Sequence, residues 1–455
     1  MPATSKASSE EDRPQSSVDD TEIRRPQSHY SERSRNDLGL DHVRSHVSHH
    51  DMAVNEDFHE VDAEQYLRFS PARKVIIVAV LSFCSFLAPI SSTSILAGVP
   101  EVAKTFNTTG SVINASNALY MAFMGIAAPF WGPFSQVWGR RPVFLVSAFL
   151  FFVFSIGTAL SPNLPAYYIF RVLTAFQGTS FLVVGSSALG DVYEPQQTLW
   201  QKIVFLWHRV SPLRVAIMLI RYPNLLCTGV AAGALVWNQY SLLTPIRYVL
   251  NPRFHLTSPI QSGLFYIAPG CGYLVGTFMG GRWADHTVKK WIRTRGGVRV
   301  PEDRLKSCLL FLGGVIPGCI LVYGWTIEKA VGGIPVPVLA MFFQGVAQLF
   351  CFPSLNTYSL DVMQSSGRSA EVVAGSYMLR YFFGALGSGL VLPAVEAMGV
   401  GWFSTISAFF LILSGVGVWL TTVFGDQWRD KVEKKELRKA EEKSGNVQQS
   451  EKGEA

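Results

Sequence analysis

The sequence predicts an all-α polytopic membrane protein with about ten transmembrane helices. Of its 455 residues, 49% are hydrophobic and only 16% are charged, against about 25% charge in an ordinary soluble domain. The apolar residues gather in long runs, and about 20 such residues are enough for a helix to cross a bilayer. No segment shows the short alternating pattern of a membrane barrel. These observations exclude a soluble globular fold and favour membrane-spanning helices.

Ten apolar segments have the required length, four before a polar stretch and six after it. They lie near 74–99, 111–136, 142–160, 166–189, 223–245, 261–281, 305–325, 333–357, 371–395 and 401–424. Lys and Arg cluster at alternate ends of these segments, and such clusters mark the cytoplasmic side of a membrane protein. Both termini are therefore expected in the cytoplasm.

The polar parts of the chain divide it into five regions. Residues 1–72 are rich in Ser, Asp, Glu, Arg and His without an apolar run, which predicts a disordered cytoplasmic tail. A bundle of four spans is expected at 73–195 and a bundle of six at 223–425. Residues 196–222 are expected to form a cytoplasmic linker, and 426–455 a charged cytoplasmic tail.

Nothing in the sequence indicates an enzyme, a cofactor or a metal site. The six cysteines are scattered through apolar runs without a CxxC pair or a His partner. The motifs of a catalytic serine elbow and of a phosphate-binding glycine loop are also missing. The charged residues are concentrated at the two ends of the chain and in a few short runs. The net charge of +6 therefore indicates orientation in a lipid bilayer rather than binding of nucleic acid.

The chain also contains an internal repeat. The second apolar segment ends in the run Gly132–Pro142 (GPFSQVWGRRP), and the sixth ends in Gly281–Asp285 (GRWAD) before further basic residues. A second pair of landmarks is Asp191, which closes the fourth segment, and Asp361, which closes the eighth. Two landmarks in the same order predict two homologous halves, an arrangement in which transporter bundles rock about a central site.

These landmarks resemble the major facilitator superfamily, and in detail its fungal drug:proton antiporter branch. The family signature G-x-x-x-D-R-x-G-R-R-P is matched at Gly132, Gly139, Arg140, Arg141 and Pro142. It departs at Gln136 and Val137, where the family has an acid and often Arg, whereas the repeat copy keeps its acid as Asp285. The resemblance covers about residues 74–424 and implies a two-bundle fold that works by alternating access.

The same resemblance defines a gap in the first half. The family has twelve spans, with an antiporter signature in a fifth span that would follow the Asp191–Pro195 landmark. Here Pro195 runs into polar residues instead, so spans five and six are expected to be absent, and a shortened splice form or an imperfect gene model would explain this. The copy of the signature in the ninth span keeps Gly384, Gly387 and Gly389, small residues that let helices pack closely.

Ionisable residues in the spans are the candidates for transport and coupling. Arg171 resembles a membrane-buried Arg linked to proton coupling in the family, and Arg380 lies nearer the middle of its span. An Arg in the bilayer centre costs at least about 2.5–3.5 kcal/mol, so we expect both to face the protein interior or a wet cavity. Snorkelling to the headgroups is the alternative for Arg171. Acids at predicted cytoplasmic span ends complete the set: Asp191, Asp285, Asp361 and Glu371.

Neutral polar residues in the second half are candidates for a substrate cavity. They are Trp237, Asn238, Tyr240, Gln344, Gln348 and Asn356. Gln344 and Gln348 are four residues apart and share one helix face, so they can line a pathway. The alternative is hydrogen bonding between helices, worth about 0.6–2 kcal/mol. Such an amphipathic cavity suits bulky organic molecules rather than inorganic ions.

Two Asn-x-Ser/Thr sequences fall on the predicted outer side. Asn107 and Asn114 begin them, and both are therefore candidate glycosylation acceptors.

The leading hypothesis is a secondary transporter that exports small organic molecules, such as drugs, toxins or secondary metabolites, in exchange for protons. Its expected partners are the organic substrate, protons and the lipid bilayer, and its expected location is the plasma membrane, with the vacuolar membrane as alternative. Two other hypotheses stay open. One is an importer or facilitator of a nutrient or organic acid. The other is a truncated form that does not transport or that binds a full-length relative.

Overall fold

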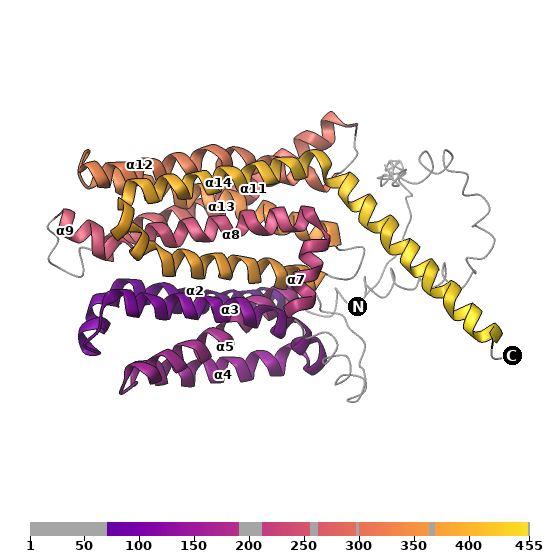
Figure 1. Ribbon diagram of the computed structural model, residues 1–455, viewed down its shortest axis with the longest axis horizontal. Helices are drawn as coiled ribbons and strands as arrows, with labels where there is room; N and C mark the ends of the chain where they lie inside the picture. The colour runs from indigo at the N-terminus through magenta and orange to yellow at the C-terminus, as the bar shows by residue number, and fades with distance from the viewer. Residues whose placement is uncertain (1–70, 191–211, 255–262, 297–299, 364–368, 454–455) are drawn as a thin grey trace, which may run out of the picture. The chain divides into compact units, whose positions relative to one another are not determined.

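The computed structural model describes residues 71–190, 212–254, 263–296, 300–363 and 369–453, and every element within these ranges is helical. Figure 1 shows their arrangement. The elements are α2 (Pro71–Thr105), α3 (Gly110–Trp138), α4 (Arg140–Ala159), α5 (Leu164–Gly190), α7 (Pro212–Arg221), α8 (Pro223–Leu243), η2 (Ile246–Leu250), α9 (Asn251–Arg253), α11 (Ile267–Thr294), η3 (Pro301–Ser307), η4 (Phe311–Val315), α12 (Ile316–Lys329), α13 (Pro335–Met363) and α14 (Ser369–Gly453). The all-α prediction is confirmed.

Helix length and apolarity mark the membrane spans. Seven helices of the described residues could cross a bilayer, or eight if the bent pair of α7 with the segment Pro223–Arg253 is one span. One of the seven, Glu371–Val432, is 62 residues long, well beyond the 17–25 residues of one crossing. It is interrupted at Gly399, whose φ of 83° and ψ of 165° are not helical, and Figure 1 shows α14 turning back on itself. The number of ten crossings stays a prediction.

The largest apolar cluster contains residues of both the first four helices and the later ones. Tyr120, Met121 and Met124 of α3 are buried in one apolar cluster with Val236 and Tyr240 of α8. Helix α3 packs against both α5 and α14, and α14 also packs against α8. The two groups of helices therefore pack against each other through a largely apolar interface.

Glycines in the first part of α14 allow this close packing. A Cβ atom on Gly384 would lie 2.9 Å from Cγ1 of Val236, and one on Gly387 would lie 3.0 Å from the carbonyl oxygen of Trp237. Both distances are shorter than ordinary carbon contacts of about 3.5–4.0 Å. The expected role of these glycines in helix packing agrees with this geometry.

Helix α11 lies even closer to α13. Gly272, Gly276 and Gly280 face it at intervals of four residues, and a Cβ on Gly272 would lie only 2.3 Å from the carbonyl oxygen of Phe342. On Gly280 it would lie 2.3 Å from the carbonyl oxygen of Leu349. Small residues at this spacing bring two backbones into contact. The sequence reasoning did not single out this stripe.

Some predicted regions fall outside the described residues. These include residues 1–70 of the predicted tail, Asp191 and most of the linker at 196–222. A compact unit begins at Ser70 and runs to the end of the chain, and α14 continues through the charged C-terminal segment to Gly453. The division into bundles of four and six spans stays a prediction.

Candidate functional site

Arg171 is buried inside the first group of helices, with 4% of its surface exposed. It lies on α5, and its Nη1 donates to the backbone oxygen of Ser91 on α2 at 3.0 Å. Its Nη2 donates to Oδ1 of Asn117 on α3, also at 3.0 Å, and the guanidinium lies 4.5 Å from the ring centroid of Tyr120. Three helices thus fix the cation, and it does not snorkel toward solvent.

Asn117 extends this contact to the second group of helices. Its Nδ2 donates to Oγ of Ser388 on α14 at 3.1 Å. Asn114, one helical turn earlier, donates to the backbone oxygen of the same Ser388. Arg171, Asn117 and Ser388 therefore form a continuous chain of polar contacts from α5 through α3 to α14. The sequence reasoning missed Asn117 and Ser388, because single neutral polar residues are common in membrane spans.

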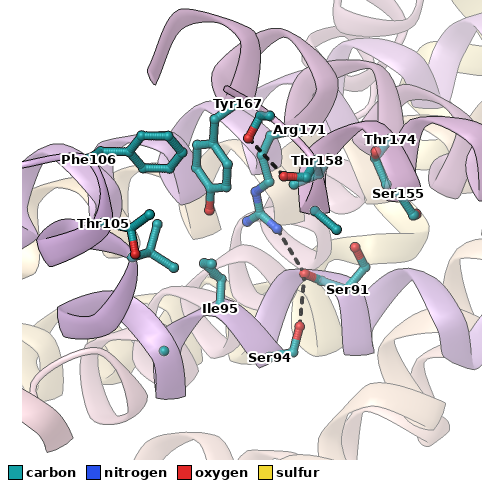
Figure 2. A pocket seen from close by; sticks show the side chains of 14 residues that line it. Ser91, Ser94, Ile95, Thr105, Phe106, Ser155, Thr158, Tyr167, Arg171 and Thr174 are labelled. Carbon is teal, nitrogen blue, oxygen red and sulfur yellow. Dashed lines mark hydrogen bonds between the residues drawn. The ribbon is translucent and has the colours of Figure 1, made fainter. Parts of the chain in front are cut away.

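A cavity of about 450 Å³ opens beside Arg171. Figure 2 shows Arg171 among hydroxyl-bearing side chains from α2, α4 and α5. The lining residues are Ser91, Ser94, Ile95, Gly98, Val102, Thr105, Phe106, Ser155, Thr158, Ala159, Ser161, Tyr167, Arg171 and Thr174. Within this set only Arg171 is charged. The cavity therefore carries one positive charge among hydroxyl and apolar side chains, and it is large enough for a small organic molecule.

Arg380 is buried in the second group of helices in a different way. Its Nη2 donates to Oδ1 of Asn356 and to Oγ of Ser376, the latter at 3.1 Å. The guanidinium lies 5.0 Å from the ring centroid of Phe352 and 5.1 Å from that of Tyr377. The adjoining cavity measures only about 110 Å³. The structure thus joins two predicted site residues, Arg380 and Asn356, in one enclosed pair.

Gln344 and Gln348 form a network between helices. Nε2 of Gln344 donates to Oε1 of Gln348 at 2.7 Å, and Nε2 of Gln348 donates to Oε1 of Gln239 on α8 at 3.0 Å. The hydroxyl of Tyr273 on α11 donates to the same Oε1 of Gln348 at 3.4 Å. Both predicted glutamines are 1% exposed. In this conformation they connect α8, α11 and α13.

The three predicted cavity residues of α8 have different surroundings. Tyr240 shares a hydrogen bond of 2.8 Å with Ser92 of α2, which joins the two groups of helices. Trp237 donates from Nε1 to Oγ of Ser407 at 3.1 Å, within the second group. Asn238 is fully buried, and among the described residues its amide finds no hydrogen-bond partner, which costs about 1–3 kcal/mol.

The acids predicted for coupling lie at different levels of exposure. Asp361, at the end of α13, pairs through Oδ2 with Nε of Arg304 at 3.1 Å. Glu371 is 8% exposed in the first turn of α14. Asp285 is exposed on α11, and Asp191 lies outside the described residues. Their part in coupling stays a prediction.

The signature loop between α3 and α4 turns at Gly139. Its φ of 87° lies in the region that favours glycine, since a side chain there would clash with the backbone. Arg140 donates to Oγ of Ser135, which ties the start of α4 to the end of α3, whereas Arg141 is exposed. The loop is thus a tight helix connection with one bound and one exposed arginine.

The other glycines of the two signature copies are less constrained. A Cβ on Gly132 would lie 3.9 Å from Cγ1 of Val183, an ordinary contact, and one on Gly281 would meet no atom within 4 Å. The structure therefore gives a steric reason for glycine at the turn of the first copy only.

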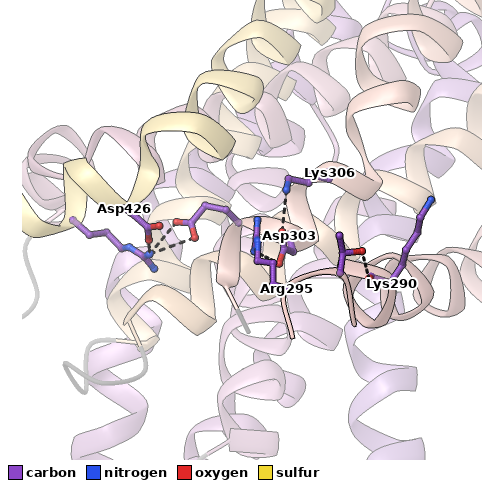
Figure 3. A network of polar contacts seen from close by, with 8 residues as sticks. Lys290, Arg295, Asp303, Lys306 and Asp426 are labelled. Atoms are coloured by element: carbon purple, nitrogen blue, oxygen red, sulfur yellow. Dashed lines mark hydrogen bonds and ion pairs between the residues drawn. The ribbon is translucent and has the colours of Figure 1, made fainter. Parts of the chain in front are cut away.

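The sequence reasoning also missed two buried acids on η3. Asp303 is 0% exposed and pairs with Nη1 of Arg295 at 2.5 Å and with Nζ of Lys306 at 3.1 Å (Figure 3). Glu302, 3% exposed, pairs with Nη2 of Arg429 on α14 at 3.2 Å. Two adjacent acids between Arg295 and Lys306 were the signal that could have indicated these ion pairs.

The two candidate glycosylation acceptors differ in access. Asn107 is exposed in the turn between α2 and α3, with a φ of 50°. Asn114 is 1% exposed and its amide nitrogen is hydrogen-bonded to Ser388. The expectation for Asn114 does not fit this structure, because an enzyme cannot reach a buried amide between packed helices. Modification of Asn107 stays a proposal.

Comparison with known proteins gives matches across much of the chain. The family model of the Major Facilitator Superfamily matches residues 81–204. The MFS transporter eqxG of Fusarium heterosporum is 23% identical over 429 residues, covering 81% of this chain and 87% of that protein. The MFS antiporter QDR3 of Candida albicans is 37% identical over 124 residues, covering 27% of this chain and 18% of that protein.

A solved structure shares the helix arrangement. The crystal structure of a D-xylose-proton symporter aligns with a TM-score of 0.54 at 14% identity, over 75% of this chain and 96% of that one. At this identity the likeness concerns the fold alone.

Proposed function

Since this chain belongs to the major facilitator superfamily of multi-pass membrane transporters, we propose that it exports small organic molecules in exchange for protons. The substrates would be drugs, toxins or secondary metabolites, and the membrane would be the plasma membrane. The name of the Candida relative, an antiporter, supports the exchange of two solutes in opposite directions. The proton gradient across such a membrane points inward, so that an antiporter driven by it exports.

The interface between the two groups of helices carries this proposal. Ser92 and Tyr240 share one hydrogen bond across it, and Asn117 and Ser388 share another. A neutral hydrogen bond contributes only about 0.5–1.5 kcal/mol net, so that these contacts can break and form again. Alternating access requires an interface of this kind, since one bundle must rock against the other.

Arg171 connects this interface to the cavity. Its partner Asn117 also binds Ser388, so any movement of α14 away from α3 changes how the arginine is held. Glu371, buried at the start of the same α14, is the acid that we propose as the proton carrier. A proton taken up there would bias the position of α14. This change of position would be passed on to the cavity beside Arg171 through Ser388.

Transport into inverted vesicles tests the proposal. Inside-out plasma-membrane vesicles from cells that express the chain would be energised to make their lumen acidic, and uptake of a panel of labelled organic compounds would be measured. We expect uptake that stops when a protonophore collapses the pH gradient. Uptake that is the same with and without the pH gradient would indicate a facilitator. Gradient-driven loss of preloaded compound would indicate an importer. No flux with any compound would support the truncated, non-transporting form.

A further inference from the structure

The cavity beside Arg171 has features that select one class of ligand. We propose that it binds organic anions, namely small carboxylates with an apolar body, and that Arg171 receives the carboxylate. The inference rests on the proposed function only for its second part, that the bound anion is a transported substrate.

The charge of the cavity is the first argument. Arg171 is 4% exposed, and its two hydrogen-bonded partners are a backbone carbonyl and an amide oxygen, both neutral. Among the described residues its Nε has no hydrogen-bond partner. A buried cation without a carboxylate partner is costly. An anion that enters the cavity would therefore gain a strong, charge-assisted contact.

Hydroxyl groups supply the second argument. Ser155, Thr158 and Ser161 line the α4 side of the cavity, and Ser94 and Thr105 line the α2 side. Each donates its hydrogen bond to a carbonyl of its own chain segment, at 2.7–3.4 Å. A hydroxyl can rotate and donate to another acceptor instead. The wall can thus provide several donors to a carboxylate without any movement of the backbone.

The apolar part of the wall supplies the third argument. Phe106 and Tyr167 contact each other with ring centroids 5.5 Å apart, and Ile95 and Val102 complete the apolar lining. The volume of about 450 Å³ lies within the range of about 300–1,000 Å³ of small-molecule sites. An inorganic anion would leave this apolar surface wet, whereas an aromatic acid would cover it.

Equilibrium binding tests the inference without any transport. The full chain would be placed in lipid nanodiscs at equal pH on both sides, and binding of radiolabelled benzoate would be measured against empty nanodiscs. Benzamide and benzylamine, which have nearly the same size and ring, would be the competitors. We expect saturable binding of benzoate that neither competitor displaces at tenfold excess. No saturable binding, or equal displacement by benzamide, would overturn the inference.

Variants connect the binding to this cavity. We expect Arg171→Gln to weaken benzoate binding at least tenfold and Thr158→Val to weaken it about threefold. Thr277→Val on α11 is the matched control, because the Thr277 hydroxyl also donates to its own helix, at 2.8 Å, but lies outside the cavity. If Arg171→Gln fails to fold, the comparison of benzoate affinity between Thr158→Val and Thr277→Val tests the site instead. Equal affinities for these two variants would place the site elsewhere.

The outcome separates this inference from the proposed function. Benzoate binding without flux in the vesicles would support the anion site and contradict the proposed export. If the chain exports uncharged compounds in a proton-driven way but does not bind benzoate, the proposed export is supported and the anion site is contradicted.

Discussion

Arg171 in the first group of helices and Arg380 in the second have similar polar partners but different surroundings. Each is buried, each donates to the amide oxygen of an asparagine, and each lies over an aromatic ring. Arg171 borders a cavity of about 450 Å³, whereas Arg380 lies between two rings beside a cavity of about 110 Å³. The same arginine–amide pair can thus serve a ligand in one half and helix packing in the other.

The largest effect should come from lengthening the first group of helices. Adding two spans from a close relative between Pro195 and Gln201 would give both halves six spans. We expect proton-coupled flux in liposomes to rise about tenfold and proton leak to fall, because polar groups that lipid cannot satisfy would then be covered. Equal and tightly coupled flux from both forms would show that the short first half is a working variant.

Removing the two arginines tests the comparison directly. We expect Arg171→Ala to reduce transport per surface molecule about fivefold, because both the cavity charge and the link to Asn117 are lost. Arg380→Ala should reduce it about threefold, through looser packing. Flux normalised to surface level is the measurement, and Lys104→Ala, at an exposed position, is the control. If both arginine variants lose the same activity, the distinction between the two sites fails.

Packing in the second group predicts a smaller effect, on stability. Gly280→Ala should lower the free energy of unfolding in detergent by about 1–3 kcal/mol, typical of overpacking, because its Cβ would meet the carbonyl oxygen of Leu349 at 2.3 Å. Its neighbour Gly281 faces open space, so Gly281→Ala is the matched control and should change little. If Gly280→Ala and Gly281→Ala unfold at the same temperature, α11 is not packed on α13 as described.

The smallest effect is expected at Ser388. Ser388→Ala removes the hydroxyl that accepts from Asn117, a bond worth about 0.5–1.5 kcal/mol, and leaves the backbone contact of Asn114 in place. We expect about a twofold change in transport at unchanged surface level, measured with the same vesicles. A change as large as that of Arg171→Ala would mean that the hydroxyl itself, and not the arginine, holds the first group to the second.

Position inside an apolar run was enough to predict that Arg171 and Arg380 would be buried. An arginine in a membrane span must find partners inside the protein, and Arg171 and Arg380 do. The partners could not be predicted, since Asn117 and Asn356 become neighbours of these arginines only when separate helices pack. The hydroxyls of the cavity carry even less signal, because Ser and Thr occur throughout apolar spans. Asn114 fits the glycosylation pattern, and only the helix contacts show that it is buried.

The reversal of α14 at Gly399 has a consequence for biosynthesis. The chain turns back within a single residue of positive φ, and the backbone nitrogen of the following Val400 donates to the carboxylate of Glu328 at 3.0 Å. No polar loop separates the two antiparallel segments, so no hydrophilic stretch has to be carried across the bilayer between them. If the segments on either side of Gly399 each cross the bilayer, they can therefore leave the translocation machinery together, as one preformed helical hairpin.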